Sequence, residues 1–351
     1  MSKISLKNER PAGGLLALYS YKIPVFGIGD VGGIIAIDNL IDDSALGGWR
    51  CFPYKTFNDS LIDGTCLARD MDRKFGLANI PMGGAKSPTT IDTSSLTTEQ
   101  NRALCFGFAE VITLLRDREG VRYITGKDMG RTDADIALVA EAAPGLVAVG
   151  SPSRPTAEGV FRIIRAFVPS GSVAIEGLGD VGMALAKLLH DFGGYKIFGH
   201  DYRNCQNEMA EKFGVIITPN ILEQDVDVFS GCAGSFGLND RTIPLLKARH
   251  SFGSANIEME DPERDSRLFQ KKNIKFLPGF GTNVGGAGSL INPFISKPIV
   301  LEQLYCRMVE TALQVVNESL CTGRTAYHIA KERAEANTAE MKKYAKVSVA
   351  A

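Results

Sequence analysis

The chain has 351 residues, of which 44% are hydrophobic and 23% are charged, and its formal net charge is -1. This length accommodates two domains that each bury a core, and the near-zero charge gives no basic surface for nucleic acid or an anionic membrane. We find no apolar core of a signal peptide near the start and no run of about 18 apolar residues later, so we expect a cytoplasmic protein.

Cysteine and histidine give no indication of a metal site. The seven cysteines form no C-x-x-C or comparable cluster, so we expect reduced, mostly buried thiols rather than disulfides or a zinc site. None of the four histidines has a metal-ligand spacing or stands next to a candidate nucleophile. Acid–base chemistry in this chain would therefore have to use other side chains.

The first half of the chain predicts short strands followed by two long helices. Extended runs broken by Gly and Asp occupy residues 24–53, and apolar residues recur at helical spacing in 57–76 and 101–118. A strand, VRYITG, follows at 121–126. The Pro-, Gly- and Ser-rich segment at 145–155 then indicates a hinge or domain boundary.

Beyond this segment, strands and helices alternate. Residues 171–177 and 195–201 predict strands around a helix at 181–193, and three more short apolar runs follow at 214–219, 226–233 and 274–280. This alternation predicts an α/β fold with an open, mostly parallel sheet covered by helices on both faces, a doubly wound (Rossmann) domain. Residues 301–345 predict two amphipathic helices.

Two copies of a G-x-G-x-x-G pattern occur, GIGDVGG at Gly27–Gly33 and GLGDVGM at Gly177–Met183. A dinucleotide turn needs a strand before it and a helix after it, because the helix N-terminus must face the pyrophosphate. The second copy meets both conditions. The first is followed by alternating β-branched residues, which predicts a β-turn between two strands, and we expect one dinucleotide site.

The residues expected at this site include the end of the next strand. Asp201 lies 24 residues after Gly177, where an acid accepts hydrogen bonds from ribose hydroxyls and favours NAD over NADP. Arg203, two residues on, could instead face a 2′-phosphate. The predicted contacts from both segments are Gly177, Gly179, Asp180, Val181, Gly182, Asp201, Tyr202 and Arg203.

Three ionisable residues in the first half are candidates for the chemistry. Lys74 stands in DMDRKFG, Lys86 follows the small residues of PMGGAKS, and Asp128 lies in the glycine-flanked loop TGKDMG. Alone, the sequence around each lysine favours a solvated surface charge over a functional group, and the aspartate could equally be a turn or capping acid.

Together, the motifs resemble the amino-acid dehydrogenases that act on Glu, Leu, Phe and Val, and the leucine/phenylalanine branch most closely. LGGWR, ARDMDRK, IPMGGAKS, YITGKDMG, RPTAEGV, GLGDVG, CAGSFGLND, GSAN and TNVGGAG occur in the order and approximate spacing of that family, over residues 20–335. The twelve-residue separation of Lys74 and Lys86 matches the family's pair of active-site lysines.

This resemblance implies roles for the three residues. Lys74 would bind the substrate α-carboxylate, Lys86 would act as the general base that activates water, and Asp128 would shuttle protons to and from the amino group. A desolvated lysine beside a second cation has a lowered pKa, which suits a base. Gly47, Gly48 and Met71 would line the substrate side.

The resemblance also implies contacts to the nicotinamide half of the cofactor, from Thr156, Cys232, Ala233, Asn256 and Asn283. Cys232 is expected as a wall residue rather than a nucleophile. Departures from the family are Ala85 in place of a third glycine and Lys127 in place of an acid or amide before Asp128. Lys127 could lower the pKa of Asp128 or meet an acidic group of the substrate.

We therefore expect two domains. Residues 1–150, with a returning C-terminal helix at about 328–351, would bind substrate and carry catalysis, and residues 151–327 would bind NAD, with a cleft that closes for hydride transfer. Ala287 and Leu290 would form an apolar side-chain pocket, in which the small Ala287 leaves room for a bulky or aromatic group.

The implied activity is NAD-dependent, reversible oxidative deamination of an apolar or aromatic L-amino acid to its 2-oxo acid and ammonia, in a homo-oligomer of at least two chains. Two alternatives stay open. A malic-type oxidative decarboxylase would need a divalent metal held by Asp128, Asp133 and Asp135, and a dinucleotide-binding regulatory protein would have lost catalysis. The sequence leaves the natural substrate, its metabolic context, the preferred direction and the oligomer size undetermined.

Overall fold

The computed structural model describes residues 3–11 and 13–348, with side chains up to Lys343. The chain divides into two compact units. Unit 1 comprises Met1–Ser151, Pro293–Ser296 and Ala336–Ala351, and unit 2 comprises Pro152–Asn292 and Lys297–Glu335. The first division falls within the Pro-, Gly- and Ser-rich segment. The last helix contributes to both units, and its part in unit 1 begins eight residues later than the position 328 given above.

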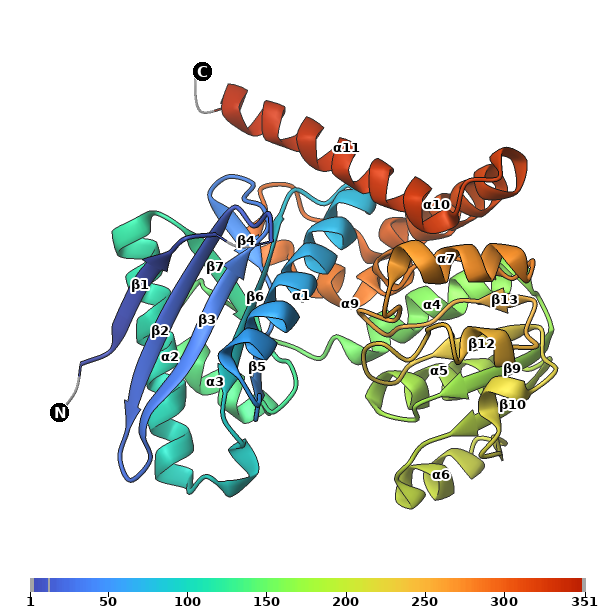
Figure 1. Cartoon of the computed structure of the whole chain (residues 1–351), viewed down its shortest axis with the longest axis horizontal. Coiled ribbons are helices and arrows are strands. Elements are labelled where there is room, and N and C mark those ends of the chain that lie inside the picture. Colours follow the sequence, from blue (N-terminus) through green and yellow to red (C-terminus); the bar gives the residue numbers. More distant parts are fainter. Residues whose placement is uncertain (1–2, 12, 349–351) are drawn as a thin grey trace. The chain divides into compact units, whose positions relative to one another are not determined.

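Unit 1 contains a mixed sheet with helices packed against it, and it includes part of the last helix (Figure 1). Its elements are β1 (Ser5–Glu9), β2 (Ala17–Val25), β3 (Gly29–Ile37), β4 (Ser44–Leu46), β5 (Trp49–Phe52), α1 (Phe57–Leu77), β6 (Gly83–Thr90), α2 (Thr98–Glu119), β7 (Arg122–Gly126), α3 (Asp133–Ala142) and β8 (Val147–Ala148). The order is β1-β2-β3-β6-β4-β7-β8, and β5 also pairs with β6. The first four strands in this order are antiparallel, and the other pairs are parallel.

The first glycine motif forms the turn between β2 and β3. Val25 pairs with Gly29 across a tight hairpin, and Gly27 and Gly29 adopt positive φ angles of 78° and 98° that favour glycine. The prediction of a β-turn is confirmed.

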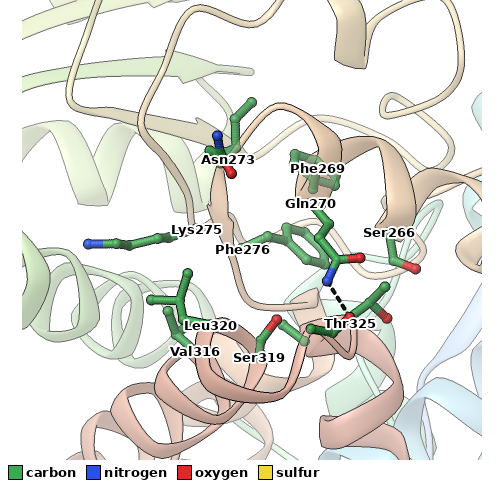
Figure 2. A pocket seen from close by; sticks show the side chains of 13 residues that line it. Ser266, Phe269, Gln270, Asn273, Lys275, Phe276, Val316, Ser319, Leu320 and Thr325 are labelled. Carbon is green, nitrogen blue, oxygen red and sulfur yellow. Dashed lines mark hydrogen bonds between the residues drawn. The ribbon is translucent and has the colours of Figure 1, made fainter.

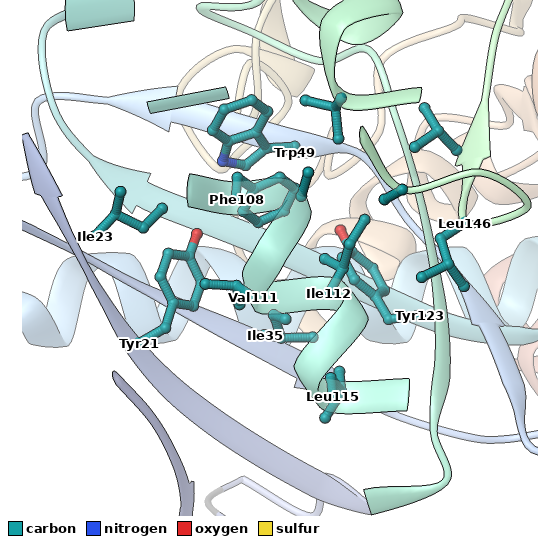
Figure 3. Close-up of a cluster of buried hydrophobic side chains, with 14 of the residues drawn as sticks. Tyr21, Ile23, Ile35, Trp49, Phe108, Val111, Ile112, Leu115, Tyr123 and Leu146 are labelled. Atoms are coloured by element: carbon teal, nitrogen blue, oxygen red, sulfur yellow. The ribbon is translucent and has the colours of Figure 1, made fainter. Parts of the chain in front are cut away.

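Successive residues of the strands in unit 1 face opposite sides of the sheet, and each side packs against a different helix. Tyr21, Ile23, Ile35 and Ile37 belong to a core with Phe108 of α2, whereas Leu18, Ile34 and Ala36 pack with Ala68 of α1. Figure 3 shows the α2 side, where the Trp49 and Phe108 rings stack at 4.1 Å. The sheet is therefore sandwiched between α1 and α2, both of which begin with a capping box at Thr56 and Thr97.

Unit 2 contains a six-stranded parallel sheet in the order β11-β10-β9-β12-β13-β14. Its elements, with the last helix shared with unit 1, are α4 (Ser153–Phe167), β9 (Gly171–Glu176), α5 (Asp180–Phe192), β10 (Tyr195–His200), α6 (Asn204–Glu211), β11 (Ile216–Ile217), β12 (Val228–Gly231), β13 (His250–Ser251), α7 (Pro262–Lys271), β14 (Lys275–Phe276), α8 (Gly279–Thr282), α9 (Val284–Leu290), α10 (Leu301–Thr322) and α11 (Ala326–Ser348).

Numbered by their order along the chain, the strands of this sheet are arranged 3-2-1-4-5-6, which is the strand order of a Rossmann domain. From the first strand, β9, the chain adds strands on one side up to β11 and then crosses to the other side at β12. The predicted doubly wound fold is confirmed. β13 was not among the predicted strands, because its two residues do not belong to an apolar run in the sequence.

The C-terminal helix reaches α1 of unit 1, where the Asn337 side chain donates a hydrogen bond to the Gly76 carbonyl oxygen at 3.0 Å. None of the helices in the described part of the chain is long and apolar enough to cross a membrane.

The prediction that the cysteines are mostly buried is wrong. All seven are free thiols, but Cys205, Cys306 and Cys321 are exposed. They lie on α6 and α10, where a small side chain is tolerated on an outward helix face.

Candidate active site

The two candidate lysines meet on the α1 side of the sheet in unit 1. Ala85, Ser87 and Thr89 of β6 face the α2 core or bond to Tyr21 within it, so Lys86, which alternates with them, faces α1. Asp63, Asp70 and Lys74 recur on α1 at intervals of seven and four residues, which places them on one helix face. Lys74 and Lys86 are 5% and 4% exposed, so neither is a solvated surface charge.

The glycines before Lys86 allow other backbone segments to approach β6 closely, α1 at Gly84 and the residues after β3 at Gly83. A Cβ placed at Gly84 would stand 2.2 Å from the Asp72 nitrogen on α1, and one placed at Gly83 would stand 2.0 Å from the Asn39 carbonyl oxygen. Ala85, where a third glycine was expected from the resemblance, is fully buried on the α2 side. Its methyl group therefore lies on the opposite face of the strand from Lys86.

Lys86 forms a largely buried ion pair with Asp128, which lies in the loop after β7. Burial lowers the pKa of Lys86, and the positive charge of Arg50 lowers it further, while Asp128 opposes both effects. Burial alone would raise the pKa of Asp128, but the charges of Lys86 and Arg50 and a hydrogen bond from Lys86 outweigh it, and the pKa of this carboxyl lies well below its usual range. The pair thus combines a carboxylate that stays ionised with an amine that loses its proton more easily than usual.

Gly47 and Gly48 provide the space that this pair needs. A Cβ at Gly48 would stand 2.8 Å from the Asp128 Cβ, and one at Gly47 would stand 1.6 Å from the Ala85 carbonyl oxygen. The two glycines therefore allow the β4–β5 connection to pass beside β6 and Asp128. Met71, on α1, is half-buried. The substrate contacts expected of these three residues stay predictions.

Lys74 has a second acidic neighbour that the sequence reasoning did not identify. Burial is the main cause that lowers the pKa of Lys74, the nearby Asp70 carboxylate opposes it, and Lys86 adds to it. Asp70 is 9% exposed, its Oδ2 atom has no hydrogen-bond partner, and burial raises its pKa to about 6. Asp70 stands one helical turn before Lys74, and this spacing is the feature by which the sequence could have pointed to it.

Lys127 has an acidic partner within the chain, and its possible contact with an acidic group of the substrate stays a prediction. Its Nζ pairs with Asp133 Oδ1 at 3.0 Å. The charges that lower the pKa of Asp128 most belong to Lys86 and Arg50.

The three carboxylates considered for a metal have separate partners. Asp133 pairs with Lys127, Asp135 accepts hydrogen bonds from Asn101 and the backbone of Thr132, and Asp128 pairs with Lys86. Within the described residues no group of three or more His, Cys, Asp or Glu side chains is arranged to hold a metal ion. The geometry therefore gives no support to the malic-type alternative.

The glycine turn of unit 2 lies between β9 and α5, and two of its glycines are required by close contacts. Gly177 has a φ of 87°, and a Cβ there would stand 2.7 Å from the Ala233 nitrogen. A Cβ at Gly182 would stand 2.0 Å from the Gly177 carbonyl oxygen. At Gly179 the nearest atom, an Arg203 nitrogen, is 3.6 Å away, so this side of the turn is open. Asp180 and Val181 form the first turn of α5, which has no side-chain cap at Gly179.

The predicted ribose acid is present and ionised. Asp201, 5% exposed, accepts a hydrogen bond from the Leu178 backbone at 2.9 Å and ion-pairs with Arg203 at 2.9 Å. Hydrogen bonds from the Arg203 side chain lower the pKa of Asp201 to about 2, although burial opposes this. Tyr202 is 87% exposed.

The expected nicotinamide contacts form two groups in unit 2. Asn283 is 4% exposed and donates to Asn256 Oδ1 at 3.1 Å, and its own Oδ1 has no partner in the structure. Thr156 lies against the backbone of Gly286 on α9, and its hydroxyl donates to the Pro152 carbonyl oxygen at 2.8 Å.

The second group lies against the glycine turn. Cys232 and Ala233 pack against Gly177. Burial raises the pKa of the Cys232 thiol, as expected of a wall residue rather than a nucleophile. Ala287 and Leu290 lie on α9, and their part in a substrate pocket stays a prediction.

These residues fit a dinucleotide. The open side of Gly179 and the uncapped N-terminus of α5 suit a pyrophosphate, the Asp201 carboxylate suits ribose hydroxyls, and the orphaned Asn283 Oδ1 suits the N–H₂ of a carboxamide.

A separate cavity of about 240 Å³ lies elsewhere in unit 2 (Figure 2). Its walls come from α7, β14, the C-terminal half of α10 and the start of α11. The stacked rings of Phe269 and Phe276 form its inner side, and Gln270 donates to the Gly323 carbonyl oxygen at 2.6 Å. It contains none of the residues predicted from the sequence.

The fold and the two clusters define a two-domain α/β oxidoreductase of the kind that uses a nicotinamide dinucleotide. The family model of the dimerisation domain of Glu/Leu/Phe/Val dehydrogenases matches residues 27–144. An L-tryptophan dehydrogenase of Nostoc punctiforme is 30% identical over 340 residues, 92% of this chain and 94% of that protein. The chain belongs to the Glu/Leu/Phe/Val dehydrogenase family.

Other relatives and solved structures agree with this assignment. A leucine dehydrogenase of Geobacillus stearothermophilus is 30% identical over 85% of this chain and 81% of its own length. A phenylalanine dehydrogenase of Thermoactinomyces intermedius is 29% identical over 86% and 87%. The crystal structure of the L-tryptophan dehydrogenase from Nostoc punctiforme has a TM-score of 0.70 at 28% identity and covers 89% of this chain and 93% of its own.

Proposed function

We propose that this protein is an NAD-dependent L-amino-acid dehydrogenase that converts an apolar or aromatic L-amino acid reversibly to its 2-oxo acid and ammonia. The observation that carries the proposal is the buried ion pair of Lys86 and Asp128 beside Lys74. Relatives named tryptophan, leucine and phenylalanine dehydrogenases support the substrate class.

The residues of unit 1 would supply binding and proton transfer. Lys74, as a buried cation, binds the α-carboxylate. Lys86, whose pKa is lowered by burial, gives up its proton and activates the water that attacks the iminium carbon, which forms when the α-carbon has lost its hydride. Asp128, ionised and hydrogen-bonded to Lys86, stabilises the protonated lysine and relays the proton to the leaving amino group.

The residues of unit 2 would hold the cofactor. The turn at Gly177–Gly182 binds the pyrophosphate, Asp201 the adenosine ribose, and Asn283 with Asn256 the carboxamide. The nicotinamide dinucleotide, when bound, accepts or donates the hydride. We propose NAD rather than NADP because the Asp201 carboxylate would repel a 2′-phosphate.

The remaining proposals concern the pocket, the assembly and the compartment. Ala287, which is small, and Leu290 would contact the substrate side chain and leave room for an aromatic ring. Because the matched family domain is described as a dimerisation domain, we propose a homo-oligomer of at least two chains, located in the cytoplasm. Light scattering after gel filtration measures the oligomer size.

Reductive amination tests the function directly. The enzyme is mixed with ammonia, NADH or NADPH, and a panel of aliphatic, aromatic and acidic 2-oxo acids, and cofactor absorbance is followed. We expect NADH consumption with aromatic or apolar oxo acids and little with acidic ones. Tight NADH binding without turnover of any oxo acid would instead support the regulatory alternative.

A further inference from the structure

Arg50 is a buried cation that pairs with Asp128, and β5 explains its position. Trp49 is fully buried in the α2 core and donates from its indole N–H to Thr89 at 2.7 Å. Because neighbouring residues of a strand face opposite sides, Arg50 must face α1. β5 pairs with β6 so that Arg50 lies opposite Pro88, two residues from Lys86.

The Arg50 guanidinium bridges α1 and the Asp128 loop. Its Nη1 donates to both oxygens of Asp63 at 3.2 and 3.0 Å, and its Nε stands 3.3 Å from Asp128 Oδ2. Arg50 is 8% exposed, so this bridge is largely shielded from water. The Tyr54 hydroxyl donates to Asp63 from a further direction, which fixes the anchor.

The Asp128 carboxylate is thereby held from three sides. Lys86 contacts Oδ2, the Met129 backbone N–H donates to Oδ1 at 2.7 Å, and Arg50 lies along the edge of both oxygens. A planar guanidinium can serve two carboxylates at once, whereas an ammonium group cannot reproduce this fork.

Arg50 also affects the charge of the pair. Its positive charge lowers the pKa of Lys86 and the pKa of Asp128. The other ionisable groups around the pair are Asp63, Asp70 and Lys74 of α1, Tyr54 after β5, and Tyr123 of β7. Of the two cations Arg50 and Lys74, Arg50 has the larger effect on the pKa of Lys86 and on the pKa of Asp128.

We propose that Arg50, anchored by Asp63 and Tyr54, is a positioning residue that holds the Asp128 carboxylate in the orientation in which it exchanges a proton with Lys86. The inference rests on the proposed function, because it assigns that exchange to catalysis. Arg50 acts through Asp128.

Two substitutions at Arg50 separate position from charge in oxidative deamination. Arg50→Lys keeps the positive charge but loses the fork, so we expect kcat to fall roughly 10- to 100-fold with KM and the pH profile near those of the wild type. Arg50→Gln also removes the charge, so the limb on which activity rises with pH should move to higher pH. Asp63→Asn weakens the anchor and should lower kcat as Arg50→Lys does. It also removes a negative charge that raises the pKa of Lys86, so its rising limb should move to lower pH.

Arg131→Lys is the matched control. Arg131 is 5% exposed, and its side chain stacks over the Trp49 ring at 4.7 Å and donates to Asn101, whereas only its backbone N–H bonds to Asp128, at the backbone carbonyl oxygen. We expect this variant to lose stability while its kcat and pH profile stay those of the wild type. If the Arg50 variants lost only stability and kept kcat and the pH profile, Arg50 would be merely structural and the proposal would be wrong.

A second measurement does not need turnover. Acetic anhydride labels neutral amines, and peptide mass spectrometry gives the labelling of Lys86 as a function of pH. We expect a higher apparent pKa of Lys86 in Arg50→Gln than in the wild type and in Arg50→Lys. Identical labelling curves would overturn the proposal even in a protein that deaminates nothing, whereas an inactive wild type with shifted curves would refute only the proposed function.

Discussion

Gly84 of β6 lies directly against the backbone of Asp72 on α1. A Cβ placed at Gly84 would stand 2.2 Å from the Asp72 nitrogen and 2.4 Å from the Ala68 carbonyl oxygen. Lys74 follows Asp72 by two residues and Lys86 follows Gly84 by two. The contact between a glycine and a helix backbone therefore sets how closely the two lysines approach each other.

Gly84→Ala should separate α1 from β6. The added methyl group meets backbone atoms, which cannot rotate away, so we expect a loss of at least about 1–3 kcal/mol in the free energy of unfolding and a large loss of kcat. Chemical denaturation measures the first and NADH turnover the second. Gly32→Ala in β3 is the control, because nothing lies within 4 Å of its Cβ position. Equal effects of the two substitutions would contradict this account.

Lys86→Ala and Asp128→Asn should each remove turnover and leave cofactor affinity nearly unchanged. Both residues lie in unit 1, whereas the glycine turn lies in unit 2. We expect kcat to fall by roughly 10²- to 10⁴-fold, the usual contribution of an acid–base group. Fluorescence titration with NADH measures the affinity, and its loss in either variant would contradict the assigned roles. Lys127→Ala, which breaks an ion pair with the exposed Asp133, should keep most of the activity.

The sequence predicted the nucleotide turn because the evidence for it is local. Both glycine motifs have the same spacing, and the residues after them distinguish a hairpin at Gly27–Gly29 from a strand–helix turn at Gly177–Gly182. The two lysines and Asp128 were identified through the family resemblance, since nothing local distinguishes them from surface charges. The structure brings these three residues together, as that resemblance implied, and leaves their roles to experiment.

Asp70 was not predicted, although its spacing from Lys74 on the same helix could have pointed to it. Arg50 and Asp63 were not predicted because their importance depends on contacts between distant segments. Arg50 meets Asp128 across 78 residues, and it does so only because β5 pairs with β6 and turns its alternate residues toward α1. Which strands pair, and which side of the sheet a side chain faces, cannot be obtained from the spacing of residues along one segment. The exposed cysteines were missed for the same reason, since composition does not tell which helix face stays uncovered.

Asp70→Asn should stabilise the protein near neutral pH. Burial raises the pKa of Asp70 from 3.8 to about 6, so the folded chain holds this proton more tightly than the unfolded chain. Stability from this group is therefore present below about pH 4 and is lost as pH rises through about 6. A shift of about two units corresponds to a gain on the order of 2–3 kcal/mol for the variant at pH 7, which disappears below pH 4.

Thermal unfolding of both proteins between pH 4 and 8 measures this difference. Asp117→Asn, at an exposed position on α2, is the control and should bring no gain at pH 7. A variant that is less stable than the wild type at every pH would show that the Asp70 carboxylate supports the fold. A rise in KM for the amino acid would additionally show that Asp70 tunes the charge of Lys74.

Asp201 and Arg203 should decide the choice between NADH and NADPH. The carboxylate is ionised over the whole working range, since Arg203 lowers its pKa to about 2. Asp201→Asn should raise KM for NADH roughly 10- to 150-fold through loss of a charge-assisted hydrogen bond of about 1.5–3 kcal/mol, and it should reduce the penalty against NADPH. Arg203→Ala leaves Asp201 without its cation and should make NADPH a still poorer substrate.

The measured quantity is the ratio of kcat/KM for the two cofactors, and Arg249→Ala, which breaks an exposed pair with Asp227, should leave that ratio unchanged. A wild-type enzyme that prefers NADPH would show that Arg203, rather than Asp201, governs recognition of the ribose.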